Sequence, residues 1–229
     1  MLKTILLLSV STLLVAGCRK DATTLPAPTP TTPDPIASPS EPGTTTRPKA
    51  LYGDAHTGKG FSTEPDFMTY LIPAGQNFCV NNTYEVDTFY TMRFKAIFDS
   101  SCIYTSADPN NQFDINKLYG FSDASSHHHQ NSARFGWNWE GGKLHIHAYC
   151  YRSGIRQSTE LGTVSLNEPH EFTIKVRSGQ YSFALDNKYF ALMERGSNES
   201  YAHGYKLLPY FGGDEAAPHD VRIQIREMK

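Results

Sequence analysis

Hydrophobic and polar residues alternate along several segments in the C-terminal three quarters of the chain. The segment Lys143–Tyr151 shows this most clearly, because every second residue is apolar: Leu144, Ile146, Ala148 and Cys150. A period of two is typical of a β-strand with one buried face. The same pattern predicts strands at Phe89–Phe98, Phe172–Arg177, Tyr181–Leu185 and Val221–Arg226. In Phe89–Phe98, the pattern predicts a buried face made of Tyr90, Met92, Phe94, Ala96 and Phe98.

Turn-forming residues separate the alternating segments. Gly141-Gly142 and Asp186-Asn187 mark two such turns, and Ser178-Gly179 between two alternating segments predicts a β-hairpin. No segment after residue 50 keeps the 3.6-residue apolar period of a helix over helical length. Many short antiparallel strands in about 180 residues predict an all-β fold, a two-sheet antiparallel β-sandwich of the jelly-roll type.

The first 49 residues have a different composition. Lys3 precedes an apolar segment from Ile5 to Gly17, which has the length of a signal peptide and is too short for a permanent membrane span. Residues 18–49 are rich in Pro and Thr, and 8 of the chain's 14 Pro lie between Pro26 and Pro48. Such sequence prefers extended conformations and cannot bury a core. We therefore expect a signal peptide at 1–17, a disordered stalk at 18–49 and one domain at 50–229.

The apolar segment ends in Leu14-Val15-Ala16-Gly17-Cys18, which resembles the lipobox of bacterial lipoproteins. The resemblance implies cleavage before Cys18 and lipidation of its thiol with palmitate-type chains, which together hold a protein stably on a membrane. The following Arg19-Lys20-Asp21 resembles the surface-export signal of lipoproteins in the Bacteroidota. We therefore expect a lipid-anchored envelope protein, in the outer membrane and displayed at the surface. The alternative is an ordinary signal peptide followed by a coincidental Cys.

Composition supports one folded domain and argues against one class of partner. All 28 aromatic residues lie at or after Tyr52, so residues 50–229 can bury a sizeable core. This part has 16 basic and 20 acidic residues without a basic cluster. A nucleic-acid-binding protein needs clustered Lys and Arg to neutralise phosphates, so we expect no nucleic-acid partner. We expect a monomer.

Three cysteines remain beyond Cys18. An oxidising compartment permits one disulfide among them and leaves one thiol. Cys150 falls on the buried face of its strand, so we expect it as a thiol. If a bridge forms, Cys79–Cys102 is the preferred pair; the alternative is that none of them pair.

Three segments are distinctive: Asn111–Asp123, Asn131–Trp137 and Leu208–Asp220. Together with the last alternating strand, they resemble secreted bacterial proteins with a concanavalin-A-like jelly roll, the fold of lectins, carbohydrate-binding modules and alginate-lyase-type enzymes. The resemblance implies two curved sheets, with glycan bound across the concave one. The chain lacks the Tyr-Phe-Lys-Ala-Gly strand motif of alginate lyases, and His145-Ile146-His147 is only loosely similar to their Gln-Ile/Val-His motif.

The polar face of the strand Lys143–Tyr151 carries the strongest candidate chemistry. Its side chains would form a ladder with a spacing of about 7 Å: His145, His147, Tyr149 and Tyr151. Aromatic rings stack on sugar rings, and imidazole and phenol groups form hydrogen bonds with hydroxyls. This pattern favours carbohydrate binding; the alternative is a solvated face without a ligand.

A polyuronate lyase would make further demands on this face. A neutral His or an ionised Tyr removes the proton α to the carboxylate, and Arg or Asn neutralises the developing enolate. The candidate donors for this second role are Arg134, Asn138, Arg93 and Lys95.

Two metal sites are conceivable from residue type and spacing. His145 and His147 share a strand face, as ligands of Zn or Fe often do, and a third ligand could come from His127-His128-His129. Oxygen ligands for Ca²⁺ are offered by Asp108, Asn110, Asn111 and Asp114. The spacing of these four residues is not that of an EF-hand loop. It is also typical of a turn, and a turn is the interpretation that we favour for this segment. We expect no bound transition metal and regard Ca²⁺ as the one conceivable cofactor.

Three functions remain open. The first is a non-catalytic domain that binds carbohydrate on one sheet face. The second is a polysaccharide lyase that cleaves a uronate-containing glycan by β-elimination, with His145 or His147 and Tyr149 as base and acid and Arg134 as carboxylate neutraliser. The third is a structural envelope protein with no ligand.

Overall fold

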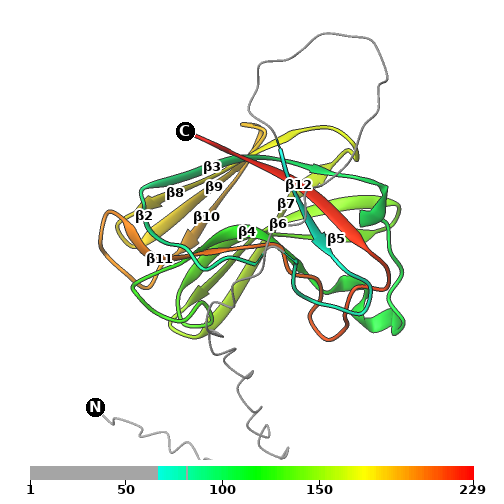
Figure 1. The fold of residues 1–229 in the computed structure, drawn as a ribbon. Helices are drawn as coiled ribbons and strands as arrows, with labels where there is room; N and C mark the ends of the chain where they lie inside the picture. Colours follow the sequence, from blue (N-terminus) through cyan, green and yellow to red (C-terminus); the bar gives the residue numbers. More distant parts are fainter. Residues whose placement is uncertain (1–66, 81) are drawn as a thin grey trace, which may run out of the picture. The chain divides into compact units, whose positions relative to one another are not determined.

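A computed structural model of the protein describes residues 67–80 and 82–229. Within this part of the chain, two six-stranded antiparallel β-sheets pack face to face (Figure 1). This arrangement confirms the predicted two-sheet sandwich. The predicted signal peptide, the lipidation at Cys18 and the stalk at 18–49 lie outside the described residues.

The first sheet has the strand order β1-β12-β3-β8-β9-β10. Its strands, in chain order, are β1 (Met68–Ile72), β3 (Thr91–Phe98), β8 (His170–Arg177), β9 (Gln180–Leu185), β10 (Tyr189–Glu194) and β12 (Val221–Met228). The second sheet has the order β2-β11-β4-β5-β6-β7. Its strands are β2 (Val86–Phe89), β4 (Asn116–Ser122), β5 (Ser132–Glu140), β6 (Lys143–Arg152), β7 (Ile155–Val164) and β11 (Ala202–Leu207).

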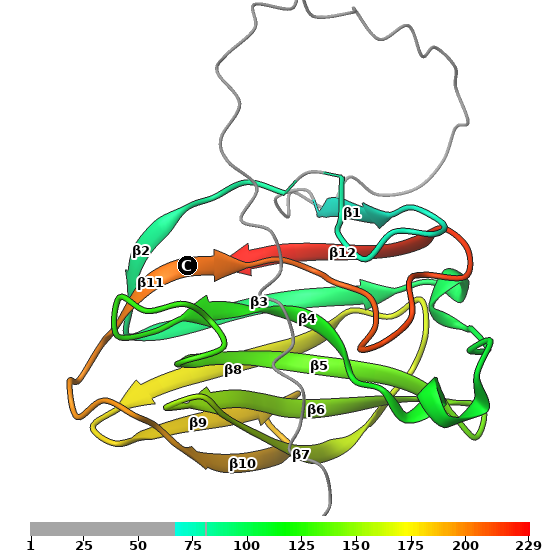
Figure 2. The ribbon, with the colours of Figure 1, turned by 90° about the horizontal axis from the view of Figure 1, so that it is seen from below.

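The chain crosses repeatedly between the two sheets, as in a concanavalin-A-like jelly roll. Strands β2 and β3 follow each other directly but belong to different sheets, and the same is true of β11 and β12. Figure 2 shows the strands of both sheets running in similar directions, which is the aligned packing of a β-sandwich. Two short 3₁₀ helices, η1 (Ser100–Cys102) and η2 (Pro109–Phe113), connect β3 to β4. No helix in the described part of the chain has the length and apolarity needed to cross a membrane.

Aromatic side chains fill the space between the sheets. Phe94 of β3 stacks on Phe172 of β8, with ring centroids 5.0 Å apart, and Phe135 of β5 meets both rings edge-on. Trp137, two residues after Phe135 on the same face of β5, is also fully buried. Burial of aromatic surface on this scale is the main stabilising contribution to such a fold.

The alternating pattern predicted most faces correctly. On β6, the four apolar side chains of the alternation are all fully buried, and Gly179 turns the chain between β8 and β9 as predicted. Tyr90 is the exception, because its side chain is 61% exposed instead of buried. It lies where the chain passes from one sheet to the other, between β2 and β3, so the strand alternation does not continue through it.

The structure does not contain the Cys79–Cys102 disulfide that we preferred. Cys79, Cys102 and Cys150 are all buried thiols. Cys102 follows β3 in η1, where its sulfur lies 3.7 Å from the carbonyl oxygen of Arg222. The prediction that Cys150 is a buried thiol is confirmed, and burial raises the pKa of its thiol.

Candidate functional site

Strands β5 and β6 present the candidate residues on the face of their sheet that points away from the core. In the register of the two strands, Arg134 stands opposite Tyr149 and Asn138 opposite His145. The predicted ladder of His and Tyr therefore shares one face with Arg134 and Asn138. Gly136 stands opposite His147. A side chain at position 136 would collide with Ile115, because an added Cβ would lie 2.2 Å from the Ile115 side chain.

Arg134 is the most unusual residue of this face. Its side chain is buried, with 6% of its surface exposed, and its guanidinium carbon lies 5.3 Å from the ring centroid of Tyr149. Among the described residues, no group accepts a hydrogen bond from its Nε. Burial lowers the pKa of the guanidinium, and the groups that oppose this shift are phenols rather than carboxylates: Tyr149, Tyr151, Tyr205 and Tyr210.

Lys117 of β4 adds a second cation to the same cluster. Its Nζ lies 5.7 Å from the ring centroid of Tyr149 and 5.6 Å from that of Tyr210, and it donates a hydrogen bond to the carbonyl oxygen of Gly212 at 2.6 Å. Burial, together with the nearby charge of Arg134, lowers the pKa of Lys117 to about 8. Two cations beside one phenol, neither of them hydrogen-bonded to a carboxylate of residues 67–80 or 82–229, form a site suited to an external anion.

The two histidines of β6 have different surroundings. His147 Nε2 lies 2.7 Å from the amide oxygen of Asn138, so this nitrogen carries the proton and Nδ1 keeps its lone pair. Burial lowers the pKa of His147, which keeps the ring neutral near pH 7. His145 faces an oxygen at both nitrogens, Glu160 Oε1 at 2.8 Å and the carbonyl of Glu140 at 3.3 Å. Of the two predicted bases, the geometry therefore favours His147.

The turn between β4 and β5 borders the same face. It carries three consecutive histidines, His127, His128 and His129. The ring of His128 contacts β11, because its Nδ1 lies 2.8 Å from the hydroxyl of Tyr205. The ring of His129 lies 5.1 Å from that of Tyr151. Burial lowers the pKa of His128 to about 3.

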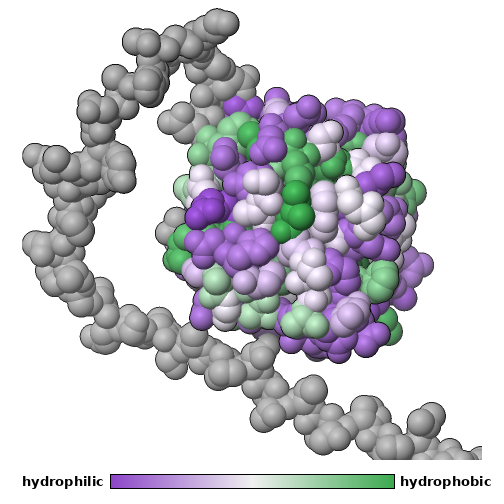
Figure 3. Space-filling view, turned by 90° about the vertical axis from the view of Figure 1, so that its right-hand side faces the viewer, coloured by the Kyte–Doolittle hydropathy of each residue, from purple (hydrophilic) through white to green (hydrophobic). Residues whose placement is uncertain are grey.

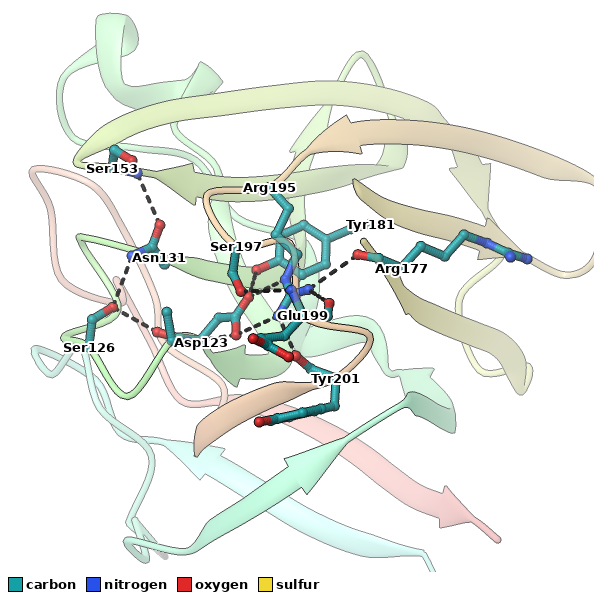
Figure 4. Close-up of polar contacts among 11 residues, drawn as sticks. Asp123, Ser126, Asn131, Ser153, Arg177, Tyr181, Arg195, Ser197, Glu199 and Tyr201 are labelled. Carbon is teal, nitrogen blue, oxygen red and sulfur yellow. Dashed lines mark hydrogen bonds and ion pairs between the residues drawn. The ribbon is translucent and has the colours of Figure 1, made fainter. Parts of the chain in front are cut away.

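A buried ion pair holds the start of this turn (Figure 4). Arg195 donates to both carboxylate oxygens of Asp123, one of them at 3.0 Å, and the hydroxyl of Tyr181 donates to the same carboxylate. At the other end, the side chain of Asn131 bonds to Ser126 within the turn. The turn is therefore fixed to β9 and to the segment after β10.

The structure does not bring all predicted site residues together. Arg93 and Lys95 lie on β3, in the other sheet, where Arg93 Nη2 forms a salt bridge with Glu171 at 2.9 Å. The alternation along β3 predicts which residues point outward but not to which sheet the strand belongs. These two residues therefore lie apart from the cluster around Arg134.

The predicted Ca²⁺ ligands are engaged in turn contacts. Asp108 caps η2, since its side chain accepts hydrogen bonds from the backbone and side chain of Asn110 at 2.9 Å. Asn111 donates to Glu215 at 2.9 Å, and Asp114 accepts from the backbone of Asp214 at 3.1 Å. Asp108 and Asn110 thus form the cap of η2, whereas Asn111 and Asp114 contact the segment after β11.

Sequence reasoning missed three members of the cluster. Lys117 lies on β4, Tyr205 lies on β11, and Tyr210 lies in the segment after β11. The order of strands in the sheet brings them to the cluster, and local sequence does not show this order. The distinctive segments Asn111–Asp123 and Leu208–Asp220 contain two of them. The unusual composition of these two segments was the only feature of the sequence that pointed to Lys117 and Tyr210.

Hydrophilic side chains cover most of the face drawn in Figure 3, around a narrow hydrophobic strip.

No known family model and no curated protein matches this chain. Solved structures with a similar fold do exist. An alginate lyase from Klebsiella pneumoniae is 12% identical, with a TM-score of 0.47 over 60% of this chain, which spans only 58% of the length of that enzyme. The alginate lyase AlyC3 in complex with dimannuronate is 11% identical, with a TM-score of 0.49 over 71% of this chain and 73% of that one. A GH16 protein of the Bacteroides ovatus mixed-linkage glucan PUL, in complex with G4G4G3G product, is 7% identical, with a TM-score of 0.45 over 73% of this chain and 84% of that one. At these identities the likeness concerns the fold alone.

Proposed function

We propose that the face formed by β4, β5 and β6 binds a polysaccharide that carries carboxylate groups. The observation that carries this proposal is Arg134, a buried cation without a carboxylate partner among the described residues. A buried charge without a counter-charge costs several kcal/mol, roughly. The carboxylate of an acidic sugar would supply the missing partner through charge-assisted hydrogen bonds.

The groups around Arg134 suit the rest of such a ligand. Lys117 offers a second positive charge, and the rings of Tyr149 and Tyr151 lie 5.9 Å apart along β6. Aromatic rings provide apolar faces for sugar rings, and phenols form hydrogen bonds with hydroxyls. The face thus combines recognition of charge with recognition of sugar.

The charge requirement can be tested with three matched glycans. Isothermal titration calorimetry would compare a polyuronate, its methyl-esterified form and a neutral glucan. We expect binding of the polyuronate and at least tenfold weaker binding of the other two. Lys117→Met should weaken polyuronate binding, whereas Lys175→Met on the exposed face of β8 should not. Equal affinity for the acid and its methyl ester would overturn the proposal.

A second candidate function is β-elimination, which the arrangement of His147, Tyr149 and Arg134 favours. Neutral His147 would take the proton α to the carboxylate at Nδ1, while Arg134 neutralises the enolate. The bond between the ring carbon and the glycosidic oxygen then breaks, a carbon–carbon double bond forms, and the phenol of Tyr149 protonates the leaving oxygen. Burial raises the pKa of Tyr149 to about 12, so the phenol holds the proton that this step requires.

Absorbance of unsaturated uronic ends separates the two candidates. A lyase would produce this absorbance from a panel of acidic polysaccharides, and His147→Ala would abolish it without loss of binding. Binding without any rise in absorbance over the whole panel would leave a carbohydrate-binding domain and exclude the lyase.

We also propose that the protein is attached to the cell envelope through Cys18. Metabolic labelling with palmitate tests this directly. We expect labelling of the wild type and none of Cys18→Ala; labelling that persists in the variant would contradict the anchor.

A further inference from the structure

Three consecutive histidines converge in the turn between β4 and β5. His127, His128 and His129 would point to alternate sides in an extended strand. Here the chain turns, because the carbonyl oxygen of His127 accepts hydrogen bonds from the backbone of Gln130 at 2.7 Å and of Asn131 at 3.3 Å. The three imidazole rings therefore gather on one side, with centroids 4.2, 4.4 and 5.1 Å apart.

The spacing of the nitrogens is close to that of a metal site. One candidate ligand atom from each ring lies within 4.8 Å of the other two, and no other part of the described chain gathers three His, Cys, Asp or Glu ligands in this way. A tetrahedral Zn²⁺ with Zn–N bonds of 2.0–2.1 Å places its ligands about 3.4 Å apart. The rings of His127 and His129 are exposed, so small side-chain rotations can close this difference.

The central ring is already oriented for coordination. His128 Nδ1 lies 2.8 Å from the hydroxyl of Tyr205, and the backbone N–H of His128 donates to the same oxygen at 3.1 Å. When Nδ1 donates its proton to this hydroxyl, Nε2 keeps a lone pair for a metal ion. Ligating histidines in proteins commonly have such a partner on the second nitrogen. The backbone N–H of His129 donates a hydrogen bond to His127 Nδ1 at 3.3 Å, which a metal on this nitrogen would displace.

We propose that this turn binds one first-row transition cation of the Zn²⁺ type through the imidazoles of His127, His128 and His129. Neutral nitrogen ligands select Zn²⁺, Cu²⁺, Co²⁺ or Ni²⁺ over Ca²⁺ and Mg²⁺, which prefer oxygen. Three protein ligands leave a fourth position for water or an external ligand. The site differs from the candidate pair of His145 and His147, whose nitrogens contact Glu160 and Asn138. It also does not depend on the proposed glycan binding.

Calorimetric titration with ZnCl₂ tests the site. The full chain is purified without a polyhistidine tag, freed of metal by a chelator and dialysed, and its fold is checked by circular dichroism. We expect one equivalent of Zn²⁺ to bind, and the visible absorption of tetrahedral Co²⁺ to appear when Co²⁺ replaces it. His127→Asn and His129→Asn, both at exposed positions, should each weaken binding at least tenfold.

Two matched variants separate this site from others. His145→Asn and His203→Asn remove imidazoles elsewhere on the same sheet and should leave the titration unchanged. Tyr205→Phe removes the partner of His128 and should weaken Zn²⁺ binding about tenfold. The proposal fails if Zn²⁺ binds more weakly than about 1 mM, if His127→Asn and His129→Asn bind as the wild type does, or if His145→Asn abolishes binding.

Discussion

Arg134 and Tyr149 stand directly opposite each other on β5 and β6, and the guanidinium carbon lies 5.3 Å from the ring centroid. The other buried arginine of this region, Arg195, has a different partner. It donates to both oxygens of Asp123, which is also fully buried. The two arginines therefore have different roles. Arg195 is neutralised inside the fold, whereas Arg134 lies against a ring and forms no ion pair with a carboxylate in the part of the chain that the structure describes.

The Asp123–Arg195 pair predicts a large stability effect. Arg195→Met leaves the carboxylate of Asp123 buried without its counter-charge, and Asp123→Asn does the converse. Each variant should lose about 3–5 kcal/mol of unfolding free energy, measured by chemical denaturation. The surface pair Arg93–Glu171 provides the control, since Arg93→Met should cost at most about 1 kcal/mol. A loss below 1 kcal/mol in both buried variants would contradict the assigned structural role.

The lowered pKa of Lys117 predicts two opposite effects of pH. Its pKa is about 8 in the folded protein against 10.5 ordinarily, so the folded protein releases this proton first. The stability of the wild type relative to Lys117→Met should therefore rise between pH 8 and 10.5. Affinity for a polyuronate should fall between pH 7 and 9, because Lys117 loses its positive charge and no longer attracts the bound anion. Affinity that stays constant in this range would remove Lys117 from the binding site.

His147 predicts a loss of stability in acid. Burial lowers its pKa below the ordinary 6.5, so the unfolded chain binds a proton that the folded protein does not. The contribution of neutral His147 to the unfolding free energy is therefore fully present above about pH 6.5. It is lost as the pH falls through the pKa of His147 in the folded protein. His147→Gln, which can still donate to Asn138, should unfold with a weaker pH dependence between pH 7 and 4. His203→Gln, at an exposed position of β11, is the control. Identical pH dependence in wild type and His147→Gln would contradict this assignment.

Gly120 predicts a constraint on the approach of β4 to β5. A Cβ added there would lie 2.2 Å from the carbonyl oxygen of Ala133 and 2.4 Å from the Cβ of Arg134. Both neighbours are backbone or directly attached to it, so the strands must separate. Gly120→Ala should destabilise the fold by about 1–3 kcal/mol and weaken glycan binding through displacement of Arg134. Wild-type stability in Gly120→Ala would contradict the close approach.

The sequence predicted the parts of the fold in which one face of a strand is buried. On β6 the alternation is complete, so the positions of His147, Tyr149 and Cys150 follow from the period of two alone. A strand that is exposed along most of its length shows no such pattern. β7 and β10 are of this kind, with Ile155 and Phe190 both more than 60% exposed, and neither strand was predicted.

The candidate site was only partly predictable for a related reason. Arg134 and His147 lie on neighbouring strands joined by a tight turn, so local pattern brings them together. Lys117 and Tyr210 come from segments more than ninety residues apart, and Arg93 belongs to the opposite sheet. Assignment of a strand to one of two sheets depends on the order of crossings between them, which local periodicity does not encode.

The central claim is that Arg134, which has no carboxylate partner among the described residues, binds a carboxylate from outside. Arg134→Met tests this most directly, because Met fills a similar volume without charge. The unfolding free energy and the polyuronate dissociation constant are measured on the same preparation. We predict that stability rises by about 1 kcal/mol or more, since an uncompensated buried charge is removed, while affinity falls about 10- to 100-fold. A variant that loses stability and still binds the polyuronate like the wild type would contradict the claim.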